Sequence, residues 1–145
     1  MSVSRTVYLR RSNMPTPEAW AKAIRAAGFP IDIDTDFDAE SFSGFLPCRY
    51  DGQESGFEYF VSTVAERKAE DEGLETTGLG DRDVGVSFVT HSSLRELAAA
   101  VAAAGVLCAQ ADGVLHDEES DERVSASNAL VDAREMIASI GEDLD

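Results

Sequence analysis

An uncharged segment of alanine, valine and leucine limits the folds open to this chain. It runs from Leu97 to Ala111 and follows Ser93-Leu94-Arg95-Glu96, a sequence typical of a capped helix start. We predict a helix over 94–110. A helix that is apolar on all sides is a buried helix, so the rest of the chain must cover it. The segment is too short to cross a bilayer, which takes about 20 residues.

Alternating apolar and polar residues predict the sheet on which this helix packs. Period-two segments are found at 3–10, 31–38, 43–50, 56–64 and 84–89, and a short strand is expected near 113–116. Asp51-Gly52 is typical of the turn of a β-hairpin. The polar, glycine-containing stretch 66–81 is predicted to be a loop with at most a helical turn.

Two further helices flank these strands. The first begins at Thr16-Pro17 and ends at Gly28, and the last begins at Ser125 or Ser127 and ends at Gly141. A short acidic tail, 142–145, follows. The order predicts one α+β domain over 1–145. We expect a mostly antiparallel sheet of about five strands with two to three helices on one face, the alanine-rich one buried.

The charge excludes several kinds of partner. The 145 residues contain 28 acidic and 12 basic groups, a formal net charge of −16. Residues 1–25 carry +4 and residues 26–145 carry −20, and the basic start is expected to pair with acidic neighbours after folding. Neutralising nucleic-acid phosphates or an anionic membrane takes clustered Lys and Arg, so neither is an expected partner. A basic protein partner fits the charge, and so does high solubility alone.

Eleven acidic residues lie in two runs, Asp32–Glu40 and Asp112–Glu122. A calcium loop starting at Asp32 would need Gly and Glu where Phe37 and Ser43 stand, so no calcium site is predicted. The alternatives to a binding role are a solvated strand face for the first run and an exposed turn for the second. The predicted partner-binding residues are Asp32, Asp34, Asp36, Asp38, Glu40, Asp51, Glu54, Glu58, Asp117, Glu118, Glu119, Asp121 and Glu122.

No motif points to catalysis, a metal or a cofactor. The zinc-ligand candidates Cys48, His91, Cys108 and His116 are at least eight positions apart, and both cysteines sit among apolar residues. A nucleophilic Cys48 assisted by His91 and a pair of carboxylates are the enzymatic alternatives. The aromatic candidates for an interface are Tyr50, Phe57 and Tyr59, about half of which must belong to the core.

The segment Ser43–Phe60, SGFLPCRYDGQESGFEYF, resembles a segment of small acidic immunity proteins encoded beside secreted antibacterial toxins in bacteria. The helix rich in leucine and alanine, the sequence GVLHDEE from Gly113 and the final helix look similar too. The resemblance covers roughly residues 16–137. It implies a cytoplasmic, non-enzymatic inhibitor that binds and neutralises a cognate toxin domain.

Besides the enzymatic alternatives named above, the physical evidence leaves two functions open. One is such an immunity protein, whose acidic patches meet a basic surface of a toxin. The other is a small acidic housekeeping α+β domain without a toxin partner. The first residues lack the apolar core of a signal peptide, because Arg5, Arg10 and Arg11 interrupt it, and a cytoplasmic location is expected. The sequence carries no signal for an oligomeric state.

Overall fold

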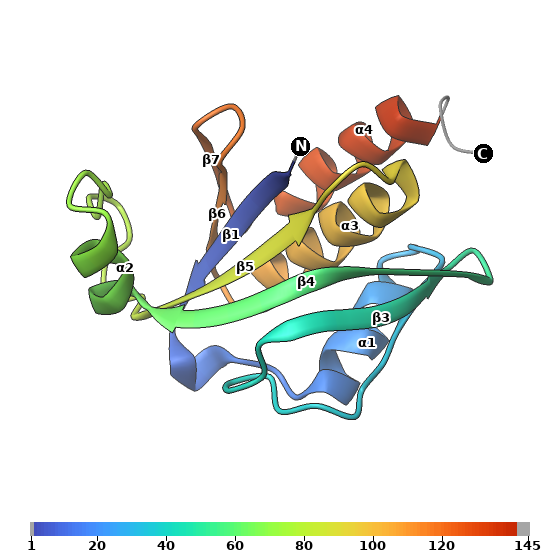
Figure 1. Cartoon of the computed structure of the whole chain (residues 1–145), viewed down its shortest axis with the longest axis horizontal. Coiled ribbons are helices and arrows are strands. Elements are labelled where there is room, and N and C mark those ends of the chain that lie inside the picture. The colour runs from blue at the N-terminus through green and yellow to red at the C-terminus, as the bar shows by residue number, and fades with distance from the viewer. Residues whose placement is uncertain (1, 142–145) are drawn as a thin grey trace.

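A computed structural model describes residues 2–141 (Figure 1). The strands are β1 (Val3–Leu9), β2 (Ile31–Ile33), β3 (Gly44–Tyr50), β4 (Gln53–Thr63), β5 (Val84–Thr90), β6 (Val114–Asp117) and β7 (Glu122–Ser125). The helices are α1 (Pro17–Ala26), α2 (Val64–Glu70), α3 (Leu94–Gln110) and α4 (Ala129–Gly141), with a 3-10 turn at Arg11–Asn13. The strands form one antiparallel sheet in the order β2-β3-β4-β5-β1-β6-β7.

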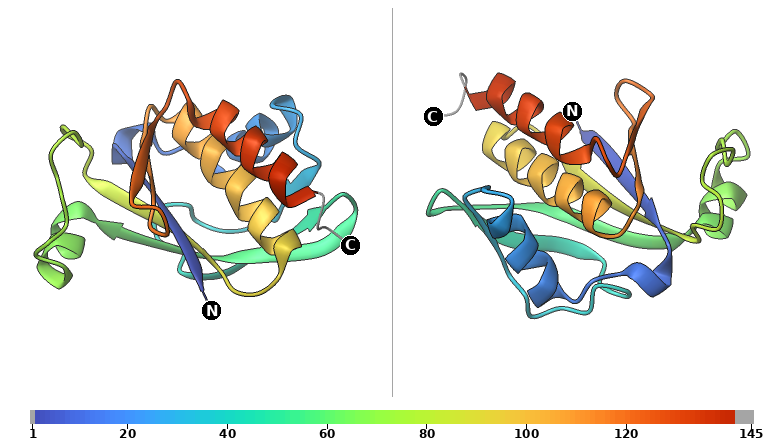
Figure 2. Two further views of the ribbon diagram at one scale, coloured as in Figure 1. Left: turned by 90° about the horizontal axis from the view of Figure 1, so that it is seen from above. Right: turned by 180° about the vertical axis from the view of Figure 1, so that it is seen from behind.

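The α+β class is confirmed, but the predicted numbers of strands and helices are both too low. The described part of the chain has seven strands instead of about five, and four α-helices. Helices α1, α3 and α4 cover one face of the sheet, whereas α2 lies beyond one end of it (Figures 1 and 2). No helix within residues 2–141 has the length and apolar character needed to span a membrane. The predicted acidic tail, 142–145, lies outside the described residues.

The predicted strand over 31–38 is wrong beyond its first three residues. β2 ends at Ile33, although apolar and polar residues go on alternating through Asp38. The Oδ1 atom of Asp34 accepts the N–H of Asp36, and Oδ1 of Asp38 accepts the N–H of Glu40. Such side-chain turns satisfy backbone donors locally and bend the chain out of the sheet.

Two elements were missed within predicted loops. The side chain of Thr63 accepts the N–H of Glu66, whose carboxylate accepts the N–H of Thr63, and this capping box starts α2 inside the expected loop. Near the C-terminus the chain folds back after β6 and adds β7, with His116 opposite Arg123. The last helix therefore begins at Ala129, later than expected.

Helix α3 is buried as predicted. Its eleven consecutive residues from Ala98 to Cys108 are all buried, between the sheet and α4. A Cβ atom added at Gly105 would lie 2.8 Å from Cβ of Ala133 in α4, so this glycine permits the close approach of the two helices. On the other side, the indole of Trp20 in α1 donates to the carbonyl oxygen of Ala103 at 3.0 Å. α3 is thus held by a helix on either side.

The opposite face of the sheet has no helix over its centre, and we call it the open face. Strand periodicity separates the two faces. In β3, for example, Leu46 and Cys48 are buried against the helices, whereas Phe45 and Pro47 point to the open face and are exposed. The open face therefore displays the outward-pointing side chains of β3 and of its neighbours in the sheet.

Candidate protein-binding surface

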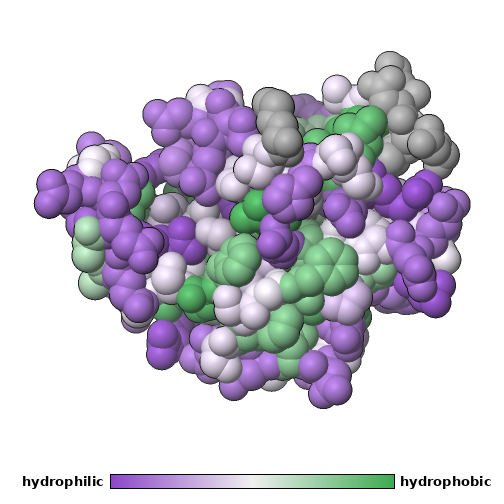
Figure 3. All heavy atoms as spheres, viewed as in Figure 1, coloured by the Kyte–Doolittle hydropathy of each residue, from purple (hydrophilic) through white to green (hydrophobic). Residues whose placement is uncertain are grey.

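Aromatic side chains are exposed on the open face at β3 and β4. Phe45 is 52% exposed and Phe60 is 36% exposed. In the strand register Phe45 lies opposite Glu58, and Phe60 lies two residues farther along β4 on the same face. Figure 3 shows hydrophobic side chains gathered near the middle of this face, with hydrophilic ones around them. Aromatic residues at such positions are the usual anchors of protein interfaces.

The ring of Phe45 is held in place by a glycine. Gly56 stands on β4 opposite Pro47, and a Cβ atom there would overlap Cζ and Cε2 of Phe45. The ring therefore rests on the backbone of Gly56 while much of it remains exposed. An aromatic side chain that is ordered before binding loses less conformational entropy in a complex.

A hollow of about 750 Å³ adjoins Phe45 at the β2 edge of the sheet. Its apolar lining comes from Ile33, Phe45, Pro47 and Cys48, and Arg49 is the one basic residue among its described lining residues. Four carboxylates line it, and they are Asp32, Asp34, Glu54 and Glu96. The register places Arg49 between Asp32 and Glu54 on adjacent strands, so these charges partly compensate one another. The lining keeps an excess of negative charge.

The first acidic run begins at this hollow, which Asp32 and Asp34 line. Asp32 forms an ion pair with Arg25, and Glu40 lies 3.9 Å from Arg11. Asp34, Asp36 and Asp38 are exposed on the segment that follows β2. Three predicted binding residues outside the runs, Asp51, Glu54 and Glu58, belong to the β3–β4 hairpin, where Glu58 meets His91 at 2.7 Å. Eight of the predicted binding residues thus belong to β2, the β3–β4 hairpin and the segment that joins them.

The second acidic run lies at the other edge of the sheet, because β2 and β7 are its two outermost strands. Glu122 is exposed at the start of β7. The other four predicted residues there contact the protein itself. The contacts are Asp117 with Arg5 at 3.5 Å, Glu118 with Thr6 at 2.9 Å, Glu119 with the N–H of Ser4 at 3.4 Å, and Asp121 with His116 at 2.8 Å.

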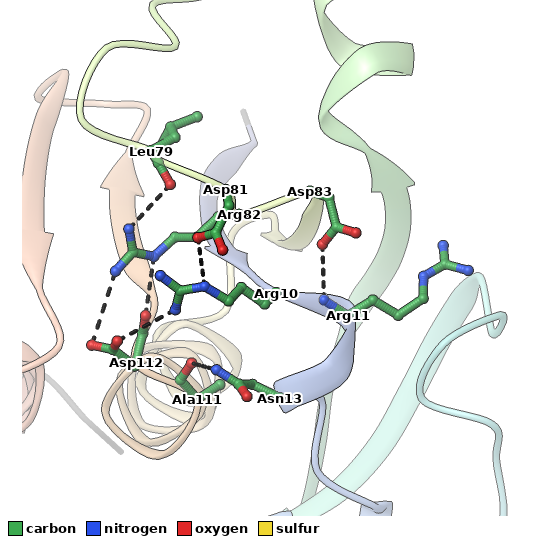
Figure 4. Close-up of polar contacts among 9 residues, drawn as sticks. All are labelled: Arg10, Arg11, Asn13, Leu79, Asp81, Arg82, Asp83, Ala111 and Asp112. Carbon is green, nitrogen blue, oxygen red and sulfur yellow. Dashed lines mark hydrogen bonds and ion pairs between the residues drawn. The ribbon is translucent and has the colours of Figure 1, made fainter.

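The expected pairing of the basic N-terminal segment is confirmed for four of its five basic residues, Arg5, Arg10, Arg11 and Arg25. Figure 4 shows Arg10 and Arg82 both directed at Asp112, which follows α3. Arg10 also contacts Asp81 at 2.6 Å, and this hydrogen bond lowers the pKa of the Asp81 carboxyl below its ordinary value. These contacts tie the end of β1 to the loop before β5.

Four polar side chains on the open face form a continuous hydrogen-bonded chain that the sequence analysis missed. Nη2 of Arg67 donates to Oγ of Ser87 at 2.8 Å, Ser87 Oγ lies 3.0 Å from Oγ1 of Thr6, and Thr6 donates to Glu118. This series of hydrogen bonds runs from α2 over β5 and β1 to the β6–β7 turn. In the sequence, this hydrogen-bonded chain is indicated only by the hydroxyl residues Thr6 and Ser87 at outward positions of β1 and β5.

The aromatic candidates Tyr50, Phe57 and Tyr59 are all buried in the core and cannot anchor a partner. The hydroxyl of Tyr59 donates to the carbonyl oxygen of Ala39 at 2.5 Å. Because β3 and β4 alternate strictly, their inward aromatics imply that Phe45 and Phe60 point outward. The exposed aromatic side chains on these two strands are therefore Phe45 and Phe60, at the positions that alternate with the predicted ones.

The two cysteines are buried free thiols, as predicted. Burial raises the pKa of Cys48 to about 11 and that of Cys108 to about 12, so both are protonated at neutral pH and are weak nucleophiles. Residues 2–141 contain no group of three or more His, Cys, Asp and Glu side chains that could hold a metal ion. Protein-family models, curated proteins and solved structures yield no significant match to this chain.

Proposed function

We propose that this chain is an immunity-type inhibitor that binds and neutralises a basic domain of a secreted antibacterial toxin in the cytoplasm. The observation that carries the proposal is the exposure of Phe45 and Phe60 on a sheet face without a covering helix, next to a carboxylate-lined hollow. Exposed aromatics supply the apolar anchor of an interface, and surrounding carboxylates steer a cationic partner toward it.

The distribution of charge supports the same function. Most of the N-terminal basic groups are used in internal ion pairs, whereas Asp34 and Glu54 are exposed and line the same hollow as Phe45. Toxin domains that act on polyanions have basic clefts. A strongly acidic inhibitor would associate rapidly with such a cleft, and no catalytic group is required for it to block access.

Co-expression with the product of the adjacent gene tests the proposal. The two proteins should co-purify, the chain should suppress the toxicity of that product, and affinity should fall as the salt concentration rises. A chain that captures no neighbouring gene product would refute the proposal. So would an affinity that is indifferent to salt, and the housekeeping alternative would then be favoured.

A further inference from the structure

We propose that the hollow beside Phe45 receives an arginine side chain of the basic partner. The inference rests on the proposed function and adds to it the chemical group recognised and the edge of the sheet that recognises it. Two features of the hollow support it, its negative charge and the exposed ring of Phe45. A third observation is that most carboxylates of the other acidic run already contact side chains of this protein.

The charge of the hollow selects a cation. Of its four carboxylates, Asp32 is engaged by Arg25, and Glu54 lies beside Arg49 in the register. The guanidinium of Arg49 is drawn toward the hairpin turn, where Nη1 donates to the carbonyl oxygen of Gly52 at 3.2 Å. The carboxylates of Asp34 and Glu96 add further negative charge to the lining. An anionic ligand would be repelled there.

The aromatic wall favours arginine over lysine. A planar guanidinium stacks on an aromatic ring and donates to a carboxylate in the same plane, whereas an ammonium is a more strongly hydrated point charge. Phe45 provides an exposed ring that rests on Gly56, and Asp34 and Glu54 provide carboxylates in the lining of the same hollow. A single arginine side chain can use both kinds of contact.

The acidic turn between β6 and β7 is a poorer site for the same group. Its carboxylates at Asp117, Glu118 and Asp121 already contact Arg5, Thr6 and His116. A partner cation would have to compete with these contacts, and the turn has no large exposed aromatic side chain. The partner is therefore recognised at the edge of the sheet formed by β2 and its neighbours β3 and β4.

The test compares two peptides of equal charge on the full chain. One alternates glycine with arginine, and the other alternates glycine with lysine. NMR titration of isotope-labelled protein at fixed salt gives both dissociation constants and the residues whose amides shift. The arginine peptide should bind roughly two- to fivefold more tightly than the lysine peptide. The shifts should centre on β2, β3 and the start of β4.

Matched variants connect this preference to the aromatic wall. Phe45→Leu should make the two dissociation constants equal, whereas Phe60→Leu, on the same face but outside the lining of the hollow, should keep the arginine preference. Asp34→Asn should weaken both peptides, and Glu122→Gln at the far edge should weaken neither. Thermal unfolding of each variant verifies that the fold is retained.

Several outcomes would overturn the inference. They are equal affinities in the unaltered protein, no binding of either peptide, a preference that survives Phe45→Leu, and shifts centred on the β6–β7 turn. Capture of the neighbouring gene product without any arginine preference would refute this inference alone. An arginine preference without such capture would refute the proposed function and leave the chemistry of the hollow in place.

Discussion

Oγ of Ser87 lies 3.0 Å from Oγ1 of Thr6, and two charged neighbours fix which hydroxyl donates. Thr6 gives its proton to the carboxylate of Glu118, so it must accept from Ser87. Ser87 in turn accepts from the guanidinium of Arg67. All hydrogen bonds therefore point the same way, from the cation to the anion. Chains with one consistent direction strengthen each of their bonds in a buried setting.

Ser87→Ala should destabilise the fold by about 1–3 kcal/mol, because Arg67 loses an acceptor and Thr6 loses its donor in a buried place. Urea denaturation at neutral pH measures the loss. Ser92→Ala, on an exposed loop, is the matched control and should stay within about 0.5 kcal/mol. In the double variant with Thr6→Val, the cost should be smaller than the sum of the two single costs. Strict additivity would contradict the hydrogen-bonded chain.

Gly105→Ala should destabilise the packing of α3 against α4. The new Cβ would lie 2.8 Å from Cβ of Ala133, and overpacking of this kind costs about 1–3 kcal/mol. Against this, alanine gains about 1 kcal/mol over glycine within a helix. Thermal or chemical unfolding gives the net change.

Ala133→Gly provides the control for that prediction. Added to Gly105→Ala, it removes the overlapping atom from the other helix. The second substitution should therefore cost less in the Gly105→Ala background than in the unaltered protein. An equal cost in both backgrounds would show that the two side chains do not meet.

Asp81 should titrate below the ordinary aspartate range. Its pKa is lowered first by the hydrogen bond from Arg10 and then by the positive charges of Arg10 and Arg82. Because the folded pKa is below the unfolded one, this contribution to stability is complete at neutral pH. It is lost as the pH falls from the unfolded pKa through the folded pKa. Carboxyl-carbon NMR follows this titration directly.

In Arg10→Gln, the pKa of Asp81 should rise toward its ordinary value. The same substitution should leave the titration of Glu66 unchanged, because the pKa of that carboxyl is lowered mainly by hydrogen bonds within the α2 capping box. If Asp81 titrates identically in both proteins, Arg10 does not hold this carboxylate in solution.

Neutralising carboxylates at the two edges should affect partner binding differently. The pair Asp34→Asn and Glu54→Gln, beside the hollow, should slow association with the cognate partner several-fold. The pair Asp121→Asn and Glu122→Gln makes the same change of charge at the other edge and should have a smaller effect. Stopped-flow association at low salt measures both. Equal slowing would indicate that only the net charge of the chain matters.

The regular elements that depend on local pattern were predictable. The alternation at 3–10 and 84–89 and the capped helix 94–110 appear in the structure near the expected bounds. The pattern failed at 34–38, where aspartate side chains satisfy the backbone locally and end the strand despite continued alternation. It also failed at β7, a strand of four residues that exists through its pairing with β6.

The candidate site depends on contacts between distant parts of the chain, and this is why the sequence indicated only its acidic members. The sequence does not indicate which of the two acidic runs is the better candidate for binding. The strand order distinguishes them, because it places them at opposite edges of the sheet. The hydrogen-bonded chain joins Thr6, Ser87 and Glu118, which are far apart in sequence. Phe45 became a candidate only when its strand partners fixed which face of the sheet has no helical cover.

The alanine-rich helix α3 also has a consequence for how this protein can vary. Six of its eleven consecutively buried residues are alanine and one is glycine. At an alanine, every replacement except glycine adds atoms to a space already filled on two sides. Larger residues can therefore enter this helix only when compensating changes arise in α4, α1 or the sheet. Phe45 and Phe60 on the exposed face of β3 and β4 are less confined, so substitutions there would alter the proposed binding surface while the interior stays fixed.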